Sequence, residues 1–155
     1  NTNANAHIVT AKLLECGVNA SAISKKLFLT KPINKLRLYG AALYNLKTAL
    51  DDKFVYVKLT KKMFIQAKAK DFEADGIINY CISVPSAVVG CVIKEIDKNT
   101  TKISLRSIEN FNLLGVVAQF GGGGHKNAAG CTINENIDDA AKKIIEAFRE
   151  KLSAK

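Results

Sequence analysis

The sequence predicts an α+β fold, in which a mixed, mainly antiparallel sheet packs against helices and is preceded by a helical linker. Apolar residues recur at helical spacing in residues 3–50 and again in residues 137–152. Between these regions, residues 54–59 and 87–96 are rich in β-branched side chains, which is typical of strands. The composition, with 48% hydrophobic and 24% charged residues and only 2 prolines, indicates a folded chain with a buried core.

Three helices are expected before the first strand. The first spans residues 3–16 and ends at Gly17, since glycine suits a helix C-terminus. The second spans residues 21–29 and stops before Pro32. Proline suits the first turn of a helix, so we expect a third helix from Pro32 to Leu50. The leucines on one side of it are Leu36, Leu43, Leu46 and Leu50.

Strands and helices alternate in the rest of the chain. Thr60 and Asn136 are expected to cap helices, because their side-chain oxygens can accept from the first backbone amides. In chain order we expect a strand at 54–59, a helix at 61–70, helical turns at 74–80, strands at 87–96 and 102–105 around a turn at 97–100, a helix at 113–120, a strand at 130–133 and a final helix from 137. The apolar stripe of the final helix is Ile137, Ala141, Ile144, Ile145, Phe148 and Leu152.

The formal net charge of +9 favours anionic partners, nucleic acid above all, although the lysines equally suit solvated helix faces. Aromatic residues make up 7% and Trp is absent, which gives little support to a stacking platform for single strands. No apolar run approaches the roughly 18 residues that span a bilayer, so we expect no membrane contact and a cytoplasmic protein. The first residue is Asn1 and not Met, which is compatible with a trimmed or proteolytic piece of a longer protein and with a natural stand-alone protein.

The cysteines lie far apart in the sequence and form no C-x-x-C pair, which excludes zinc-knuckle and dithiol redox motifs. Each has apolar neighbours, so we expect four buried free thiols in a reducing cytosol. They are Cys16, Cys81, Cys91 and Cys131.

The segment Gly121-Gly122-Gly123-Gly124-His125 is predicted to bind phosphate. Glycine loses the most backbone entropy on folding, so a run of four among 10 glycines needs a reason. Without Cβ atoms, successive N–H groups can turn inward and form a nest for an oxyanion, and His125 can donate a further hydrogen bond. The alternative is a flexible loop, but flexible linkers mix Gly with Ser, and this run lies between two apolar elements. Walker and dinucleotide-binding loops are excluded by the spacing.

Arg106 is the second candidate, within Ser104-Leu105-Arg106-Ser107 at the end of a predicted strand. A guanidinium between hydroxyl side chains can clamp a phosphate with two parallel hydrogen bonds. An isolated Arg at this place is more often a solvated surface residue. The nearby glycine run makes the phosphate interpretation the better one.

No catalytic or metal-binding constellation is visible in the sequence. His7 and His125 are the only histidines, and there is no D-x-D or paired carboxylate. Asp71, Glu73 and Asp75 lack a nearby His and are predicted to form a loop and a helix cap. We therefore expect no catalytic residue, no metal ligand and no cofactor in this chain.

The motifs together resemble the C-terminal, DHH-associated domain of the DHH phosphoesterase family. The resemblance rests on residues 104–107 (SLRS), on residues 120–130 (FGGGGHKNAAG) and on residues 75–80 (DGIINY), which resemble the segment that opens this domain's binding cleft. It covers about residues 33–155, and residues 1–32 resemble the end of the catalytic domain and its linker helices. The most similar subgroup is the bacterial oligoribonuclease type, which also dephosphorylates 3′-phosphoadenosine 5′-phosphate.

The resemblance implies a substrate-binding domain that acts opposite a catalytic domain of the same polypeptide. In the family, that catalytic domain holds two manganese ions through an Asp-His-His signature, which this sequence lacks. Short RNA or a nucleotide is the implied substrate, and the chain alone is expected to be inactive. Arg106, Ser104, Gly121–Gly124 and His125 are implied to hold phosphate and sugar, and Asn79 is implied to line the same cleft.

Two other functions stay open on the sequence. The same domain occurs in cyclic-dinucleotide phosphodiesterases, and a related domain forms the RNA-binding tail of alanyl-tRNA synthetases. The Ser-Leu-Arg-Ser segment and the opening helices favour the phosphoesterase over the synthetase tail. The oligomeric state is not determined by the sequence, which is compatible with a homodimer.

Overall fold

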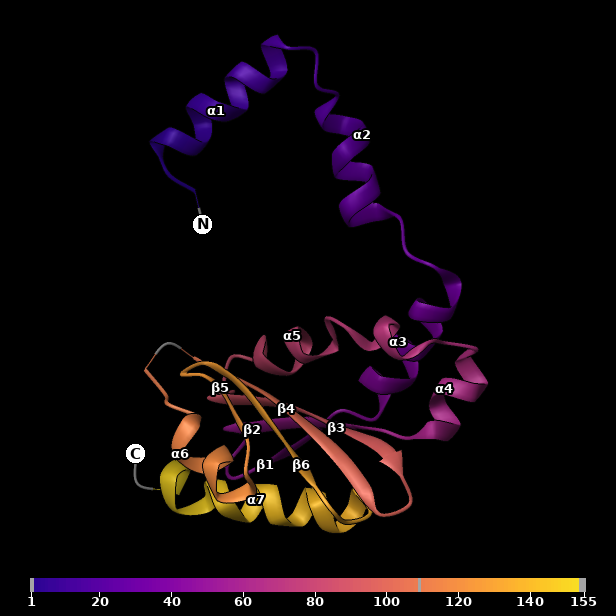
Figure 1. Ribbon diagram of the computed structural model, residues 1–155, viewed down its shortest axis with the longest axis vertical. Helices are drawn as coiled ribbons and strands as arrows, with labels where there is room; N and C mark the ends of the chain where they lie inside the picture. The colour runs from indigo at the N-terminus through magenta and orange to yellow at the C-terminus, as the bar shows by residue number, and fades with distance from the viewer. Residues whose placement is uncertain (1, 109, 154–155) are drawn as a thin grey trace. The chain divides into compact units, whose positions relative to one another are not determined.

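The computed structural model of the protein describes residues 2–108 and 110–153 (Figure 1). It divides into two compact units, Asn1–Ile33 and Asn34–Lys155. We describe each unit by itself.

The first unit consists of helices with short capping motifs. Helix α1 spans Ala4–Glu15, α2 spans Ala20–Ser24, and a π-helical turn, η1, continues it over Lys25–Leu29. The side chains of Asn3 and Asn19 accept hydrogen bonds from the amides of Ala6 and Ala22, at 2.9 and 2.8 Å, and so cap the two α-helices. The two helices predicted at 3–16 and 21–29 are confirmed. Cys16 is exposed at the end of α1, so the prediction of four buried thiols is wrong at this position.

The second unit is built on a six-stranded sheet with the order β1-β2-β3-β4-β6-β5. Strands β2 and β3 are parallel and all other neighbours are antiparallel, which confirms the predicted mixed, mainly antiparallel sheet. The strands are β1 (Lys47–Ala49), β2 (Phe54–Leu59), β3 (Val89–Asp97), β4 (Thr100–Ser107), β5 (Gly123–His125) and β6 (Ala128–Ile133).

Helices lie on both sides of this sheet (Figure 1). On one side are α3 (Ile33–Tyr44), α4 (Lys61–Ala67), the 3-10 turn η2 (Asp71–Ala74) and α5 (Ile77–Ile82). On the other side are α6 (Leu114–Val117), the 3-10 turn η3 (Ala118–Phe120) and α7 (Ile137–Ser153). Successive strand residues point to opposite sides, so the sheet divides the apolar side chains between two cores.

The two cores cover different parts of the sheet. The α7 core lies under β2, β3, β4 and β6 and includes Phe54, Ile103, Leu105 and Phe148. The α3–α5 core lies over β2 and β3, where Val55, Val57 and Val92 contact the helices. The same side of β4 and β6 carries no buried apolar cluster among the described residues. An open strip of sheet therefore remains beside α5.

The local predictions of caps are confirmed. Thr60 accepts from the Met63 amide at 3.3 Å and begins α4. Asn136 accepts from the amides of Asp138 and Asp139, both at 3.0 Å, and begins α7. Glu73 is buried and accepts from the Lys70 amide at 2.7 Å, which confirms a capping role for this part of the acidic segment.

The third predicted helix is too long. Helix α3 ends at Tyr44, and the chain then forms the short strand β1, which pairs with β2. Leu46 packs against the α3–α5 core, whereas Leu50 packs against the α7 core on the other side of the sheet. Leucines at helical spacing thus fill two different cores. The turn after β1 has positive φ angles at Leu50, Asp51 and Asp52, which a helix does not allow.

Candidate functional site

Strand β4 presents its polar side chains on the open side of the sheet. Lys102 and Arg106 are exposed and Ser104 is half-buried, whereas the intervening Ile103 and Leu105 are buried in the α7 core. This is the two-residue alternation of a strand that has one covered face and one open face.

Strand β6 continues the open face with small side chains. In the antiparallel register, Arg106 pairs with Ala128, Ser104 with Gly130, and Lys102 with Thr132. Paired residues point to the same side of a sheet. The charged and hydroxyl groups of β4 therefore lie beside a shallow floor of small residues.

The glycine run is not a free loop, because part of it forms the edge strand β5. Gly123 pairs with Gly130, and His125 pairs with Ala128. Since Ala128 also pairs with Arg106, His125 and Arg106 point to the same side, two strands apart. Strands lie about 4.8 Å apart, so this places the two backbones roughly 10 Å from each other.

Three glycines of the run are explained by the protein's own structure. Gly121 and Gly124 have φ angles of +65° and +138°, which side-chain-bearing residues rarely adopt. A Cβ atom on Gly122 would lie 2.4 Å from the Gly130 carbonyl oxygen and 2.5 Å from the Cys131 Cβ. Gly122 is therefore required for close packing of the run on β6.

Gly123 is different, because nothing among the described residues excludes a side chain there. Its φ is not positive, and a Cβ atom built on it meets no atom within 4 Å. Through Gly130, Gly123 is in register with Ser104 and so faces the open side of the sheet. The space in front of Gly123 is therefore open to a ligand.

The predicted nest of successive amides is wrong for the first half of the run. The Gly121 amide donates to the Ala118 carbonyl at 3.1 Å, and the Gly122 amide donates to the Val117 carbonyl at 2.9 Å. Both donors are already used within the chain. The glycines shape this site by the side chains they lack more than by a ring of free N–H groups.

The turn between β5 and β6 is fixed to the end of β4 through Asn127. The side-chain nitrogen of Asn127, Nδ2, donates to the Ser107 hydroxyl at 3.0 Å and to the backbone carbonyls of Ile108 and Phe111 at 2.6 and 3.0 Å. Ser107 donates in turn to Phe111 at 2.7 Å. Ser107 is therefore part of the scaffold, and this network holds Arg106 in place relative to the glycine hairpin.

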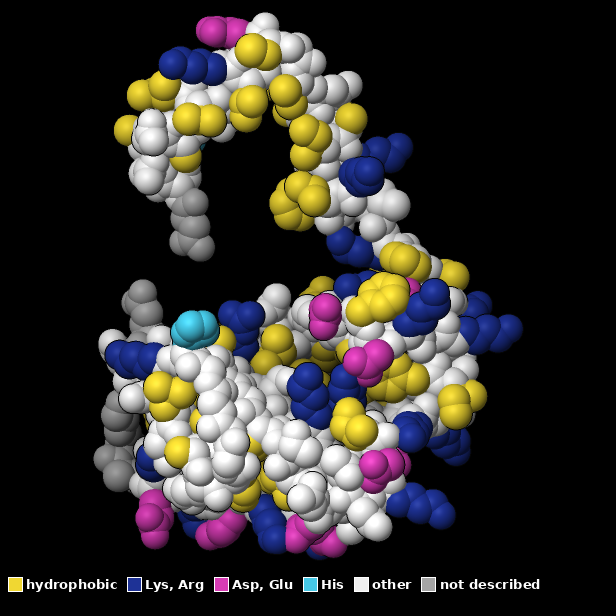
Figure 2. Space-filling view, viewed as in Figure 1, with side chains coloured by type: hydrophobic (Ala, Val, Ile, Leu, Met, Phe, Trp, Pro, Cys, Tyr) yellow, Lys and Arg dark blue, Asp and Glu magenta, His cyan; other side chains and the backbone are white. Residues whose placement is uncertain are grey.

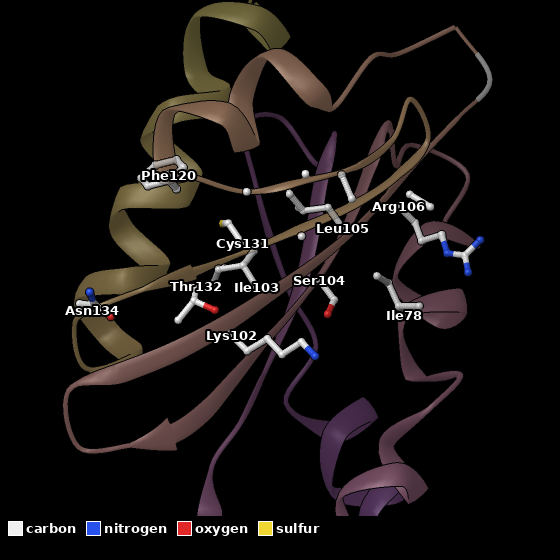
Figure 3. A pocket seen from close by; sticks show the side chains of 16 residues that line it. Ile78, Lys102, Ile103, Ser104, Leu105, Arg106, Phe120, Cys131, Thr132 and Asn134 are labelled. Atoms are coloured by element: carbon white, nitrogen blue, oxygen red, sulfur yellow. The ribbon is translucent and has the colours of Figure 1, made fainter.

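Strands β4 and β6, the glycine run and α5 border a solvent-open pocket of about 770 Å³ on the open side of the sheet (Figure 3). Ile78 of α5 forms one wall, and Phe120 with the glycine run forms the other. Lys102 and Arg106 are the only charged residues among the described lining, so the pocket is cationic. The lining residues are Ile78, Lys102, Ile103, Ser104, Leu105, Arg106, Phe120, Gly121, Gly122, Gly123, Ala128, Ala129, Gly130, Cys131, Thr132 and Asn134.

The pocket contains only some of the residues chosen from the sequence. Ser104, Arg106 and Gly121–Gly123 line it. Gly124 and His125 lie on β5 outside the lining, and Gly124 faces the β6 backbone. Asn79 is exposed on α5 and does not line the pocket, where its neighbour Ile78 takes that place.

Lys102 and Thr132 are pocket residues that the sequence reasoning missed. Lys102 stands two residues before Ser104 and four before Arg106. Its position in the same alternating pattern was a signal that could have identified it.

The described residues 2–108 and 110–153 contain no group of three or more His, Cys, Asp or Glu side chains that could hold a metal ion. None of the helices in the described part of the chain combines the length and apolar character needed to cross a membrane.

Comparison with known protein families assigns the part of the chain that forms this pocket to one of them. Residues 51–153 match the model of the DHHA1 domain, and this range contains Arg106, the glycine run and the whole pocket lining. The chain belongs to the DHHA1 domain family of the DHH phosphoesterases. The resemblance found in the sequence is thereby confirmed.

Relatives of this DHHA1 chain include proteins of about twice its length. This chain is 29% identical over 146 residues to the bifunctional oligoribonuclease and PAP phosphatase NrnA of Thermus thermophilus. The match covers 94% of this chain and 43% of that protein. An exopolyphosphatase-related protein of Bacteroides fragilis superposes with a TM-score of 0.84 at 28% identity, covering 97% of this chain and 45% of that one. The chain thus spans less than half the length of both relatives.

A more distant structural neighbour is a pGpG-specific phosphodiesterase of Vibrio cholerae. It superposes with a TM-score of 0.53 at 19% identity, covering 78% of this chain and 39% of that protein. This likeness shows that the fold is shared.

Proposed function

We propose that this chain is the substrate-binding part of a DHH phosphoesterase that hydrolyses short oligoribonucleotides, 3′-phosphoadenosine 5′-phosphate or both. The supporting observation is the cationic pocket, in which Arg106 and Ser104 lie beside a floor of small residues and on the same side of the sheet as Gly123. The similarity to a Thermus oligoribonuclease and PAP phosphatase supports a nucleotide as ligand. The catalytic residues and the manganese ions would belong to the part of the protein outside this chain, and the reaction would occur in the cytoplasm.

Four residues in and beside the pocket have a definite task in this proposal. The Arg106 guanidinium binds a substrate phosphate, because a planar fork of donors matches two phosphate oxygens. The Ser104 hydroxyl can donate to the same phosphate or to a ribose oxygen. Gly123 leaves room for the ligand to approach the β5 backbone. His125, on the same side as Arg106, can donate to a ligand that extends beyond the pocket edge.

Arg106→Ala tests this proposal. The 155-residue chain should bind AMP in a calorimetric titration, and Arg106→Ala should weaken that binding at least tenfold. A hydrogen bond to a charged group contributes about 1.5–3 kcal/mol, and 1.4 kcal/mol corresponds to a factor of ten. The matched control is Arg149→Ala, because Arg149 lies on α7 and pairs with Glu146 at 2.8 Å, on the covered side of the sheet.

The two variants separate a specific site from general attraction by a chain of charge +9. Arg149→Ala should leave the affinity within about twofold of the unmodified chain. Equal losses in Arg106→Ala and Arg149→Ala would show that AMP is attracted only by net charge. That result would overturn the proposed role of the pocket.

A further inference from the structure

The pocket has a second cationic end that the proposed binding of one phosphate does not use. Lys102 and Arg106 lie four residues apart on β4 and point to the same side. At about 3.3 Å per residue, their Cα atoms are roughly 13 Å apart. Figure 3 shows the Lys102 ammonium and the Arg106 guanidinium at separate places in the pocket, with Ser104 between them along the strand.

Lys102 has no carboxylate partner among the described residues. Its register partner on β3, Lys94, forms an ion pair with Asp71 at 2.7 Å, so that carboxylate already has a cationic partner. Lys102 forms no ion pair in the described part of the chain and is exposed. The ammonium is therefore available to an anion that enters the pocket.

The surroundings of Lys102 are polar and continuous with the Arg106 end. Thr132 pairs with Lys102 across β4 and β6, and Asn134 lines the pocket just beyond it. The floor between the two ends is made of Ala128 and Gly130, which leave space for a ligand to lie along the strand. This geometry suits a ligand that carries two phosphate groups.

We propose that Lys102 forms a second phosphate subsite, so that the pocket binds a 5′-phosphorylated dinucleotide more tightly than a nucleoside monophosphate. This inference rests on the proposed function and adds to it a second phosphate that the ligand carries. Arg106 holds one phosphate of the dinucleotide, and Lys102 contacts the other. A mononucleoside monophosphate carries one phosphate and satisfies the Arg106 end alone.

The test compares two ligands on three variants of the 155-residue chain. The ligands are 5′-phosphorylated diadenylate, pApA, and AMP, titrated with EDTA present to prevent metal-dependent turnover. Lys102→Ala should weaken pApA binding about tenfold and change AMP binding less than twofold. Lys102→Arg keeps the charge and should retain most of the affinity for pApA. The control is Lys98→Ala, which removes the same charge from the β3–β4 turn outside the pocket lining.

Thermal unfolding of each variant verifies the fold, which a change at the exposed Lys102 should preserve. Unchanged pApA affinity in Lys102→Ala, or equal losses for pApA and AMP, would overturn the second subsite. Loss of both ligands in Arg106→Ala would in that case leave the proposed function intact. If the unmodified chain bound neither ligand, the proposed function and this inference would fail together.

Discussion

Gly122 and Gly123 are neighbours with the same side chain, yet the structure imposes opposite requirements on them. A Cβ atom at Gly122 would collide with the Gly130 carbonyl and with Cys131, whereas one at Gly123 would extend into open space. The first glycine serves packing, and the second leaves room in the pocket. Alanine substitutions should separate these two roles.

We expect Gly122→Ala to lower the free energy of unfolding by about 1–3 kcal/mol, because overpacking forces the backbone to move. Gly123→Ala should leave it unchanged or raise it by up to about 1 kcal/mol, because alanine restricts the unfolded chain. The same Gly123→Ala variant should weaken AMP binding, since its Cβ occupies pocket space. Urea unfolding and AMP titration of both variants measure the two effects. Normal AMP binding by Gly123→Ala would mean that the ligand does not approach β5.

At the residue scale, sequence reasoning succeeded where a pattern is local. Arg106 and Ser104 share one face of a predicted strand, so their common direction follows from alternation. Asn79 was selected from a family resemblance to the segment at 75–80, but the side of a short helix that faces a sheet depends on packing. The buried Ile77 and Cys81 determine that orientation of α5 and leave Asn79 exposed.

At the scale of elements, α7 supports the site without contributing a residue to the pocket lining. It covers the side of the sheet opposite the pocket through Ile144, Phe148 and Leu152, all fully or nearly fully buried. Its N-terminus is held by Asn136, whose oxygen accepts from two backbone amides. Stability and ligand binding should therefore respond differently to changes in this helix.

We expect Asn136→Ala to lower the free energy of unfolding by about 1 kcal/mol, the usual effect of losing a helix cap. Asn136→Ser keeps an accepting oxygen and should preserve most of that stability. AMP affinity should be the same in both variants, because Asn136 does not line the pocket and the side chains of Ser104 and Arg106 point away from the α7 core. Thermal unfolding with parallel titrations checks this. A cap variant with weakened AMP binding would contradict the separation of the two faces.

Element boundaries were predictable where a cap or a long periodic stripe is present, as in α7. They were not predictable where tertiary contacts override periodicity. The spacing of Leu43, Leu46 and Leu50 predicts one face of a helix, yet Leu46 and Leu50 pack against cores on opposite sides of the sheet. Strand β5 was also missed, because a glycine run has no strand propensity and pairs only when β6 is beside it.

At the scale of the whole second unit, each of the two cores contains buried, protonated cysteine thiols. Cys81 lies in the α3–α5 core, whereas Cys91 and Cys131 lie in the α7 core. Burial raises the pKa of Cys81 and of Cys131 from the ordinary value of 9.0 to about 11, and it raises the pKa of Cys91 as well. Folding therefore requires these thiols to keep their protons.

The sign of the resulting pH effect follows from proton linkage. Below pH 9 both the folded and the unfolded chain hold the thiol protons, and the stability is fully present. As the pH rises from 9 towards 11, the unfolded chain releases these protons while the folded chain keeps them. The free energy of unfolding should therefore fall across this range, by about 2 kcal/mol for Cys81 alone.

Cys81→Ala isolates this contribution. The variant loses some stability at pH 8, because the core loses a buried sulfur, but its stability should then fall less steeply between pH 9 and 10.5 than that of the unmodified chain. Cys16→Ala is the matched control, because Cys16 is exposed, and it should keep the original slope. Urea unfolding across this pH series gives the three slopes. If the Cys81→Ala slope equalled that of the unmodified chain, the alkaline loss of stability would have to arise from groups other than Cys81.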